Sequence, residues 1–545
     1  MKVIYKNMEV NVDEGSSVLE YFKDAINANK NIIACIVNNE VKSLNYILQE
    51  NDEVELLDTT TRDGARIYTR GLLYIMSMAF DEIYPEIELS VNYQLSSSMF
   101  CKTENSEITE EMLENIRAKM QEIINENIQI KKVQMSKREA LELMRKEKTL
   151  VGIAQIENKQ KEDVSFYFCK DYYNYFFGVM PISTGYIQLF DIMIYNDGFL
   201  IRYPNKKEPN KMSPYIDTKK LHATLKEYDD INHILEISTL HEINEKIRRG
   251  EGKDLILLSE ALHEKKIAQI ADKITQNKNK RVVLIAGPSS SGKTTFSKRL
   301  GIELQLNGVR PKTISVDNYF VEREQTPLGE DGKLNFEALN AIDLQLLNKD
   351  IIALLNGEEI DMPTFNFKTG HKEFNGNKMK LEKDEVLVME GIHCLNDDLT
   401  PEIPKEQKFK IYISALTVLN IDYYNRISTT DTRIIRRTVR DSQFRGYDAL
   451  HTLSAWASVT EGEEKNIFPF QEQADVMFNS SLVYEINALK KYALPLFEKI
   501  GKDKKEYSEA KRLCEFLKYF EQINVEDIPK NSLLREFIGN GIFDY

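Results

Sequence analysis

The chain has 545 residues, of which 42% are hydrophobic and 29% are charged, and its formal net charge is -14 at pH 7. These are values of a globular protein, and the length predicts about three or four domains. The acidic balance argues against broad binding of nucleic acid or of anionic membranes through net charge.

Membrane and redox signals are also informative. No apolar run approaches the length of a membrane span, and residues 1–6 lack the apolar core of a signal peptide. The five cysteines are scattered and odd in number, without a CxxC pair (Cys35, Cys101, Cys169, Cys394 and Cys514). We therefore expect a cytoplasmic protein with reduced thiols, no zinc site and no membrane partner.

The first 60 residues predict a small β-grasp unit. Residues 3–5 and 8–12 flank Lys6-Asn7 as a hairpin, residues 18–28 are helical, and residues 32–37 and 53–57 are strands. The unit resembles the TGS domain at the start of threonyl-tRNA synthetases, including Val37-Asn38-Asn39-Glu40, where those enzymes have Val-Asn-Gly-Glu. We assign residues 1–60 to such a domain.

Residues 61–215 resemble the second, editing-type domain of the same synthetases, an α+β unit. Their His-x-x-x-His is replaced by a run with Arg70 and Tyr74 at its ends, and their Cys-x-x-x-His by Cys169 to Tyr173. Only the cysteine survives, so the domain is degenerate and we expect no hydrolytic editing. We interpret it as a binding or scaffold module, and an RNA is the partner that the resemblance implies.

Helical patterns follow the editing-like segment and close the chain. Residues 216–280 predict a helical connector, broken at Gly250 and Gly252, that holds the next domain at a set distance. Residues 499–545 predict a helical tail. Within it, residues 506–520 form an amphipathic helix and residues 533–538 pack back on a core.

Between these segments lies a stretch that fits the phosphate-binding pattern G-x-x-x-x-G-K-[ST] without a mismatch. A strand over residues 281–286 leads into it and a helix leaves it. Backbone N–H groups and the helix N-terminus would cradle phosphates, Lys293 would reach the β- and γ-phosphates, and Thr294 would offer a hydroxyl to Mg²⁺. The predicted nucleotide-binding residues are Gly287, Ser289, Ser290, Ser291, Gly292, Lys293, Thr294 and Thr295.

Two acids follow apolar strands downstream. Asp317 ends the strand that begins at Thr313, and it could accept a proton from an attacking hydroxyl or merely cap a turn. Glu390 ends the strand that begins at Glu385, and it could complete a Mg²⁺ shell or be an ordinary acid at a strand end. We expect His393 to be a structural hydrogen-bonding residue.

A basic run occupies residues 433–446, with arginines at helical spacing. Two interpretations apply: a helical lid whose arginines neutralise a transferring phosphoryl group, or a solvated basic helix. Because the chain carries a net charge of -14, a run this basic favours a local anion and hence the lid.

These motifs occur in one order, at residues 287–295, 317–319, 335–343, 363–371, 390–391 and 440–446. In this order and spacing, the segment 281–498 resembles the uridine kinase branch of the uridine kinase/phosphoribulokinase family. The resemblance implies a P-loop kinase with a mostly parallel, doubly wound sheet, using ATP (or GTP) and Mg²⁺. It implies that Asp317 is the base, that Lys293, Arg440 and Arg445 hold phosphates, and that Thr294 and Glu390 serve Mg²⁺.

The acceptor side departs from that family. Where it has Pro-x-Tyr-Asp-Phe, this chain has Phe365 and Asn366, and Ala455 stands where a glutamine reads the pyrimidine edge. His371 is kept. Since lost edge contacts weaken discrimination, we expect weak or broadened nucleoside use. The predicted acceptor pocket comprises Asp317, Tyr319, Phe365, His371, Arg433 and Trp456, with an ordinary core as the alternative for Phe365 and Trp456.

The sequence therefore predicts a multi-domain α/β and α+β kinase that phosphorylates a small acceptor, a nucleoside first of all. Two alternatives stay open. One is a nucleotide-switched regulator that associates with RNA or the ribosome through its N-terminal pair; the other is a kinase of a polyol or a sugar phosphate. Asp317 separates the regulator from a kinase, because a switch needs no base for an acceptor hydroxyl. A homo-oligomer is compatible with all three.

Overall fold

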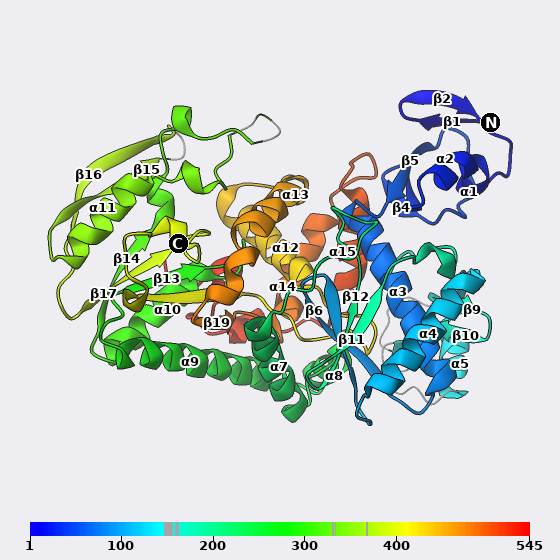
Figure 1. The fold of residues 1–545 in the computed structure, drawn as a ribbon, viewed down its shortest axis with the longest axis horizontal. Coiled ribbons are helices and arrows are strands. Elements are labelled where there is room, and N and C mark those ends of the chain that lie inside the picture. The colour runs from blue at the N-terminus through cyan, green and yellow to red at the C-terminus, as the bar shows by residue number, and fades with distance from the viewer. Residues whose placement is uncertain (147–155, 158–162, 330–331, 333, 367–368, 545) are drawn as a thin grey trace.

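A computed structural model describes residues 1–146, 156–157, 163–329, 332, 334–366 and 369–544. Figure 1 shows the N-terminal domain at one corner, the second domain beneath it, and the nucleotide-binding region on the opposite side. Among the described helices, none combines the length and the apolar character that a membrane crossing requires.

The first domain is a five-stranded sheet with the strand order β2-β1-β5-β3-β4. Strand β1 pairs antiparallel with β2 and parallel with β5, which confirms the β-grasp expectation. A capping box between Ser17 and Glu20 starts the helical segment. Its elements are β1 (Lys2–Tyr5), β2 (Met8–Asn11), α1 (Val18–Tyr21), α2 (Lys23–Ala28), β3 (Ile32–Val37), β4 (Glu40–Lys42) and β5 (Glu53–Asp58).

The second domain packs two antiparallel sheets, ordered β11-β12-β7-β6 and β10-β9-β8, around the long helix α3. This helix is buried along most of its length, and Thr61 caps its first turn. The elements are α3 (Arg62–Ile83), β6 (Leu89–Leu95), β7 (Ser98–Thr103), α4 (Glu110–Glu126), β8 (Lys131–Ser136), α5 (Lys137–Lys146), β9 (Asp163–Cys169), β10 (Tyr172–Asn174), β11 (Asp191–Tyr195) and β12 (Gly198–Arg202).

The nucleotide-binding region is built on a five-stranded, all-parallel sheet ordered β14-β17-β13-β18-β19, as the resemblance implied. Strand β13 lies at its centre, where the strand order reverses. The strands are β13 (Val282–Ala286), β14 (Arg310–Ser315), β17 (Glu385–Glu390), β18 (Lys408–Ser414) and β19 (Val476–Asn479), and β15 (Ile360–Asn366) and β16 (His371–Met379) form a separate hairpin. The helices are α10 (Lys293–Leu306), α11 (Leu344–Leu355), α12 (Thr429–Arg440), α13 (Ala449–Asn466) and α14 (Glu485–Phe497).

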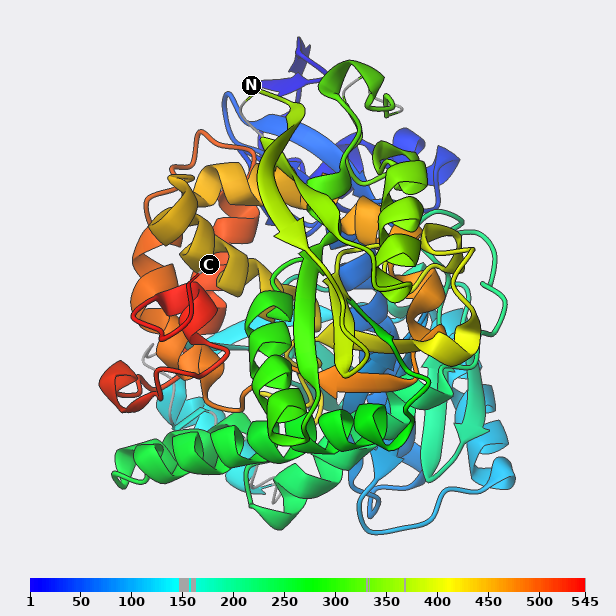
Figure 2. The same cartoon turned by 90° about the vertical axis from the view of Figure 1, so that its left-hand side faces the viewer.

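The segment predicted as a connector consists of α7 (Lys219–Ile234), α8 (Leu240–Arg248) and α9 (Gly252–Gln276). It differs from the expected spacer, because its apolar residues belong to the core of the parallel sheet. Ile256 and Ile270 on α9 are buried in the same cluster as Phe296 on α10. Figure 2 shows α9 running along the lower edge of that region. The helices are therefore a layer of the nucleotide-binding region, since only packing hides so many apolar side chains.

The tail folds back, as predicted. Helix α15 (Tyr507–Leu517) buries Leu513, and the single turn α16 (Arg535–Ile538) with the residues just before it buries Leu533 and Phe537, all in the core of the parallel sheet. Helix α15 also reaches the first domain, where the Val41 N–H donates to Ser508 Oγ at 3.1 Å.

A buried ionic cluster joins three parts of the chain. Arg66 on α3 and Arg512 on α15 both pair with Asp431 on α12 and with Glu509 on α15, at distances of 2.7 to 3.2 Å. The arginines hold the pKa of Glu509 and of Asp431 below their ordinary values, although burial opposes this. The second domain is thereby fixed to the first turn of α12, the helix that carries the basic run.

Candidate phosphate-transfer site

The predicted phosphate cradle lies where β13 ends and α10 begins. Gly292 has a φ of +85°, and a Cβ placed on it would lie 2.5 Å from Leu533, so only glycine fits. Gly292, the N-cap residue of α10, has no side chain to cap the helix, but Glu536 accepts the Thr295 N–H in the first turn at 3.2 Å. The start of the helix therefore holds a carboxylate and favours anions.

Lys293 curls back over the loop that precedes it. Its Nζ donates to the carbonyl oxygens of Gly287 at 2.9 Å and Pro288 at 3.4 Å. Burial raises the pKa values of Asp317 and Glu390, and the charge of Lys293 partly offsets that rise. The lysine is thus a cation that these two acids share.

The two strand-end acids lie at the same edge of the sheet. Asp317 sits in a 3₁₀ turn (Val316–Tyr319) directly after β14, and Glu390 ends the neighbouring strand β17. Burial raises the pKa of both carboxyls, and Lys293 partly offsets that rise. Perturbed carboxyls of this kind cluster at functional sites.

Thr294 and Glu390 fit a magnesium ion that is bound mainly through nucleotide phosphates. Thr294 Oγ1 lies 3.5 Å from Glu390 Oε1, so the hydroxyl and the carboxylate stand side by side at the cradle. Among the described residues, no group of three or more carboxylate, imidazole or thiol side chains could hold a metal. Mg²⁺ commonly takes one or two protein ligands and completes its shell with phosphate and water.

Sequence reasoning missed two further acids. Glu463 on α13 accepts the Ser289 N–H at 2.8 Å and pairs twice with Arg433, at 2.6 Å for each bond. Burial raises the pKa of Glu337, and the charges of Glu463 and Asp317 raise it further. Glu337 stands in the motif at residues 335–343, which could have revealed it, whereas nothing local marks Glu463 within its acidic stretch.

The basic run divides between core and cradle. Arg436 is fully buried, pairs with Glu485 at 2.5 Å and donates to the Ser290 carbonyl at 3.3 Å. Arg437 donates to Ser289 Oγ at 2.7 Å. Arg440 bonds to Asp441 at 2.8 Å, and Arg445, which is 52% exposed, lies 3.7 Å from the same carboxylate. The run is helical, as predicted, but its first half is not a solvated face.

Phe365 and His371 lie on the hairpin β15–β16. The ring of Phe365 meets that of Phe320 at 5.5 Å, and its N–H donates to Asn318 Oδ1 at 3.4 Å, next to Asp317. His371 is largely exposed and contacts Glu322 at 2.6 Å. The structure therefore places both residues on the Asp317 side of the cradle.

Other predicted acceptor residues are turned into the core. Tyr319 is fully buried, and its hydroxyl donates to Asp350 at 3.0 Å. Trp456 is 2% exposed and covers the guanidinium of Arg433 at 5.4 Å, while that guanidinium is bound to Glu463. The alternative of an ordinary core describes Trp456, and Tyr319 and Arg433 are likewise buried and already bonded within the protein.

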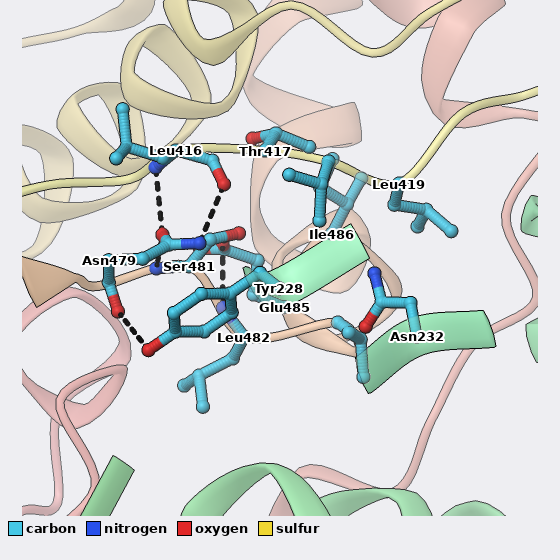
Figure 3. Close-up of a pocket in the computed structure, with 12 residues that line it drawn as sticks. Tyr228, Asn232, Leu416, Thr417, Leu419, Asn479, Ser481, Leu482, Glu485 and Ile486 are labelled. Carbon is cyan, nitrogen blue, oxygen red and sulfur yellow. Dashed lines mark hydrogen bonds between the residues drawn. The ribbon is translucent and has the colours of Figure 1, made fainter. Parts of the chain in front are cut away.

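A separate, small pocket lies between α7 and the loops after β18 and β19 (Figure 3). Tyr228, Asn232 and Glu485 help to line it, but no residue of the cradle does. Asn479 closes one side by bonding the Leu416 backbone at 2.8 and 2.9 Å. The pocket is thus not the predicted acceptor site.

The editing-like cleft is filled. The Tyr74 ring packs edge-on against Tyr172 and Phe176 at 5.2 and 5.7 Å, and Phe176 meets Tyr424 from the loop before α12 at 6.0 Å. Cys169 is fully buried, and burial raises its pKa to about 11. Of the two groups that replace the histidines, Tyr74 packs against aromatic rings and Arg70 donates to the Val179 carbonyl.

The comparisons with known proteins fall on the two halves separately. Residues 282–486 match the model of the phosphoribulokinase/uridine kinase family. The uridine kinase of Ligilactobacillus salivarius is 30% identical over 206 residues, which cover 37% of this chain and 87% of that enzyme. The uridine kinase of Deinococcus deserti is 32% identical, over 30% of this chain and 70% of that enzyme.

The N-terminal part resembles a different enzyme. A threonine–tRNA ligase of Clostridium kluyveri is 26% identical over 269 residues, which cover 48% of this chain. The match spans 40% of that ligase's length. The chain thus joins part of a synthetase-like N-terminus to a nearly complete kinase-like segment.

Proposed function

We propose, because the chain belongs to the phosphoribulokinase/uridine kinase family, that it transfers the γ-phosphoryl group of ATP or GTP to a hydroxyl of a small acceptor, most simply the 5′-hydroxyl of a nucleoside. The observation that carries the proposal is the grouping, at the carboxyl ends of neighbouring strands, of Lys293, the N-terminus of α10 and two acids with a raised pKa, Asp317 and Glu390. Phosphoryl transfer depends mainly on such positioning and charge stabilisation.

In the proposed mechanism, Asp317 accepts the proton of the acceptor hydroxyl. Desolvation raises its pKa, which makes it a stronger base than an unperturbed aspartate, and Lys293 partly offsets that rise. Thr294 and Glu390 would hold Mg²⁺, which neutralises charge on the phosphates when bound. Lys293 would exchange its bonds with Gly287 and Pro288 for phosphate oxygens.

The second half of the basic run would complete the charge stabilisation. Arg440 ends α12, and Arg445 ends the π-turn that follows it (Asp441–Arg445). Both guanidinium groups pair with the Asp441 carboxylate. A triphosphate is a stronger partner for a guanidinium than one carboxylate. We propose that these two arginines turn from Asp441 to the transferring group.

The acceptor proposal rests on the hairpin side of the site. Phe365 and Phe320 pack against each other in the core next to the turn that carries Asp317, and His371 with its Glu322 partner lies on the same hairpin as Phe365. The tyrosine hydroxyl and the glutamine amide of the family pattern are missing at Phe365 and Ala455. We therefore propose a nucleoside kinase with weak or broad base discrimination.

The direct test is an acceptor screen. Purified protein with labelled ATP and Mg²⁺ is offered nucleosides, sugars and polyols, and phosphorylated product is counted. Label should pass to several nucleosides, with uridine and cytidine poor, and the double variant Phe365→Tyr with Ala455→Gln should raise uridine use. Strict and efficient use of uridine by the unmodified protein would show that other residues identify the base.

A nucleotide-switched regulator is the second candidate, and one observation favours it. The loop before α12 is built into the editing-like domain, where the Tyr423 carbonyl accepts the Val91 N–H at 2.7 Å and Asn420 donates to the Val91 carbonyl at 2.9 Å. A ligand of the N-terminal pair, such as RNA, would then act on the helix of the basic run. If no acceptor is phosphorylated and Asp317→Asn leaves slow hydrolysis unchanged, the regulator is the better proposal.

A further inference from the structure

The C-terminal segment, residues 529–544, holds the phosphate cradle that the proposed function assigns to the nucleotide. Glu536 Oε2 accepts hydrogen bonds from the Thr295 N–H at 3.2 Å and from Thr295 Oγ1 at 2.7 Å. Thr295 is fully buried, and it is the third residue of α10. Its N–H is one of the four at the helix start that have no partner within the helix.

Two apolar contacts fix the same segment to the cradle. Leu533 is fully buried against Gly292, where even a single added carbon would collide with it. The Phe537 ring lies 5.0 Å from the Arg436 guanidinium, which donates to the Ser290 carbonyl in the cradle. The segment therefore contacts the loop at its glycine, through its arginine support and at the first turn of its helix.

A carboxylate at this position is an anion in a site for anions. The N-terminal N–H groups of the helix and the dipole that favour phosphate favour Glu536 for the same reason. Two anions cannot share these donors, since they compete for the N–H group and repel each other at short range. The charge of Glu536 already reaches the neighbouring acid, because it adds to the rise in the pKa of Glu390.

We propose that residues 529–544 are an internal ligand of the phosphate cradle, and that a nucleoside triphosphate must displace Glu536 from Thr295 in order to bind. The inference rests on the proposed function, because it requires that the cradle takes a nucleotide. It adds that the free protein is self-inhibited through its own C-terminal segment. Exposure of Glu536 is partial, so its side chain can leave without opening the Leu533 core.

The test is calorimetric titration of the full chain with ATP and Mg²⁺. Glu536→Gln keeps the size of the side chain and removes its charge, and Glu526→Gln, an exposed glutamate earlier in the tail, is the matched control. The Kd should fall about tenfold in Glu536→Gln, the scale of one charge-assisted hydrogen bond, and stay unchanged in Glu526→Gln.

Hydrogen exchange of the unmodified protein gives a measurement that needs no variant. Addition of ATP and Mg²⁺ should speed amide exchange in residues 529–544 while it slows exchange in the cradle. If the wild type binds the nucleotide but either the Kd of Glu536→Gln or the exchange of the segment is unchanged, the internal-ligand proposal is wrong and the kinase proposal survives. If neither protein binds ATP, both proposals fail.

Discussion

Two regions of the chain differ in the charge of their side chains: the editing-like region is packed mainly with neutral groups, and the phosphate-transfer site gathers acids. In the editing-like cleft, Tyr74 packs against Tyr172 and Phe176, and Cys169 is buried as a neutral thiol. In the phosphate-transfer cleft, the charge of Lys293 acts on four acids with raised pKa values (Asp317, Glu337, Glu390 and Glu463), of which Glu463 is buried. Like charges gathered in a partly desolvated site oppose folding. Such a cluster persists where function requires it, whereas the other cleft has exchanged chemistry for packing.

The largest expected effect of a single substitution is at Lys293, in the phosphate-transfer site. Lys293→Ala removes the cation from the acidic cleft, and turnover of ATP should fall about a hundred- to a thousandfold, the scale of losing one charge-stabilising group. Initial rates and nucleotide titration would measure the loss, with circular dichroism to check the fold. Lys383→Ala, an exposed lysine in the turn before β17, is the control. Turnover near that of the wild type would remove the basis of the cradle assignment.

The next largest effect is expected at Asp317, where both the rate and its dependence on pH can be measured. Asp317→Asn should lower phosphoryl transfer by about a hundredfold and leave nucleotide affinity largely intact. Because burial raises the pKa of Asp317, the ionised base appears only as the pH rises through that raised value, so the wild-type rate should climb over a range above that of an exposed aspartate. The variant should lose this limb of the pH profile.

Asp398→Asn, an exposed aspartate, should keep both the rate and the profile of the wild type. If Asp317→Asn instead abolished binding of ATP with Mg²⁺ and left the rate per bound nucleotide unchanged, Asp317 would be a metal ligand and not the base.

The parts of the site that sequence could reveal are those that local patterns encode. A strand, a glycine-rich loop and a helix are adjacent in sequence, so the cradle around Lys293 can be predicted from the local pattern. Acids at strand ends, such as Asp317, can be predicted because ligands bind at the carboxyl ends of parallel strands. The resemblance to known families supplied the order of the domains. Apolar periodicity likewise predicted the amphipathic helix near the C-terminus, which the structure confirms in α15.

The rest depends on contacts between distant residues. Glu463 meets Ser289 from 174 positions away, and Glu536 meets Thr295 from 241 positions away. No local pattern distinguishes either glutamate from its solvated neighbours. The basic run shows the same dependence on distant contacts. Helical spacing alone does not distinguish Arg433 from Arg440, but Arg433 faces inward because it pairs with the buried Glu463.

The junction between the two clefts offers a test of stability. Arg512→Ala leaves Asp431 and Glu509 with less positive charge in a buried site, so the free energy of unfolding should fall by about 3 kcal/mol. Denaturant unfolding at pH 7 would measure it. Arg248→Ala breaks a more exposed pair with Glu521 and should cost less than about 1 kcal/mol. Equal losses of unfolding free energy in the two variants would mean that the buried cluster stabilises the fold no more than an exposed ion pair does.

The same cluster predicts the direction in which stability changes as the pH falls. The arginines lower the pKa values of Asp431 and Glu509 in the folded protein, so their stabilisation is complete above the unfolded values near 4 and is lost as the pH falls through the lowered values. Arg512→Ala should therefore lose less stability than the wild type on acidification below about pH 4. An equal or steeper loss in the variant would contradict the assignment.

The smallest expected effect lies in the filled cleft, where we predict no hydrolysis of mischarged Ser-tRNA at all. Cys169 has a pKa raised to about 11, so at neutral pH it is a buried thiol without nucleophilic character. Replacing Arg70 and Tyr74 by histidine should not restore activity, because Tyr172 and Phe176 still occupy the space that a substrate would need. A synthetase with its editing histidines intact is the positive control. Hydrolysis by the unmodified chain that Cys169→Ala abolishes would overturn this, and it would mean that the two clefts do not differ in the way their side chains indicate.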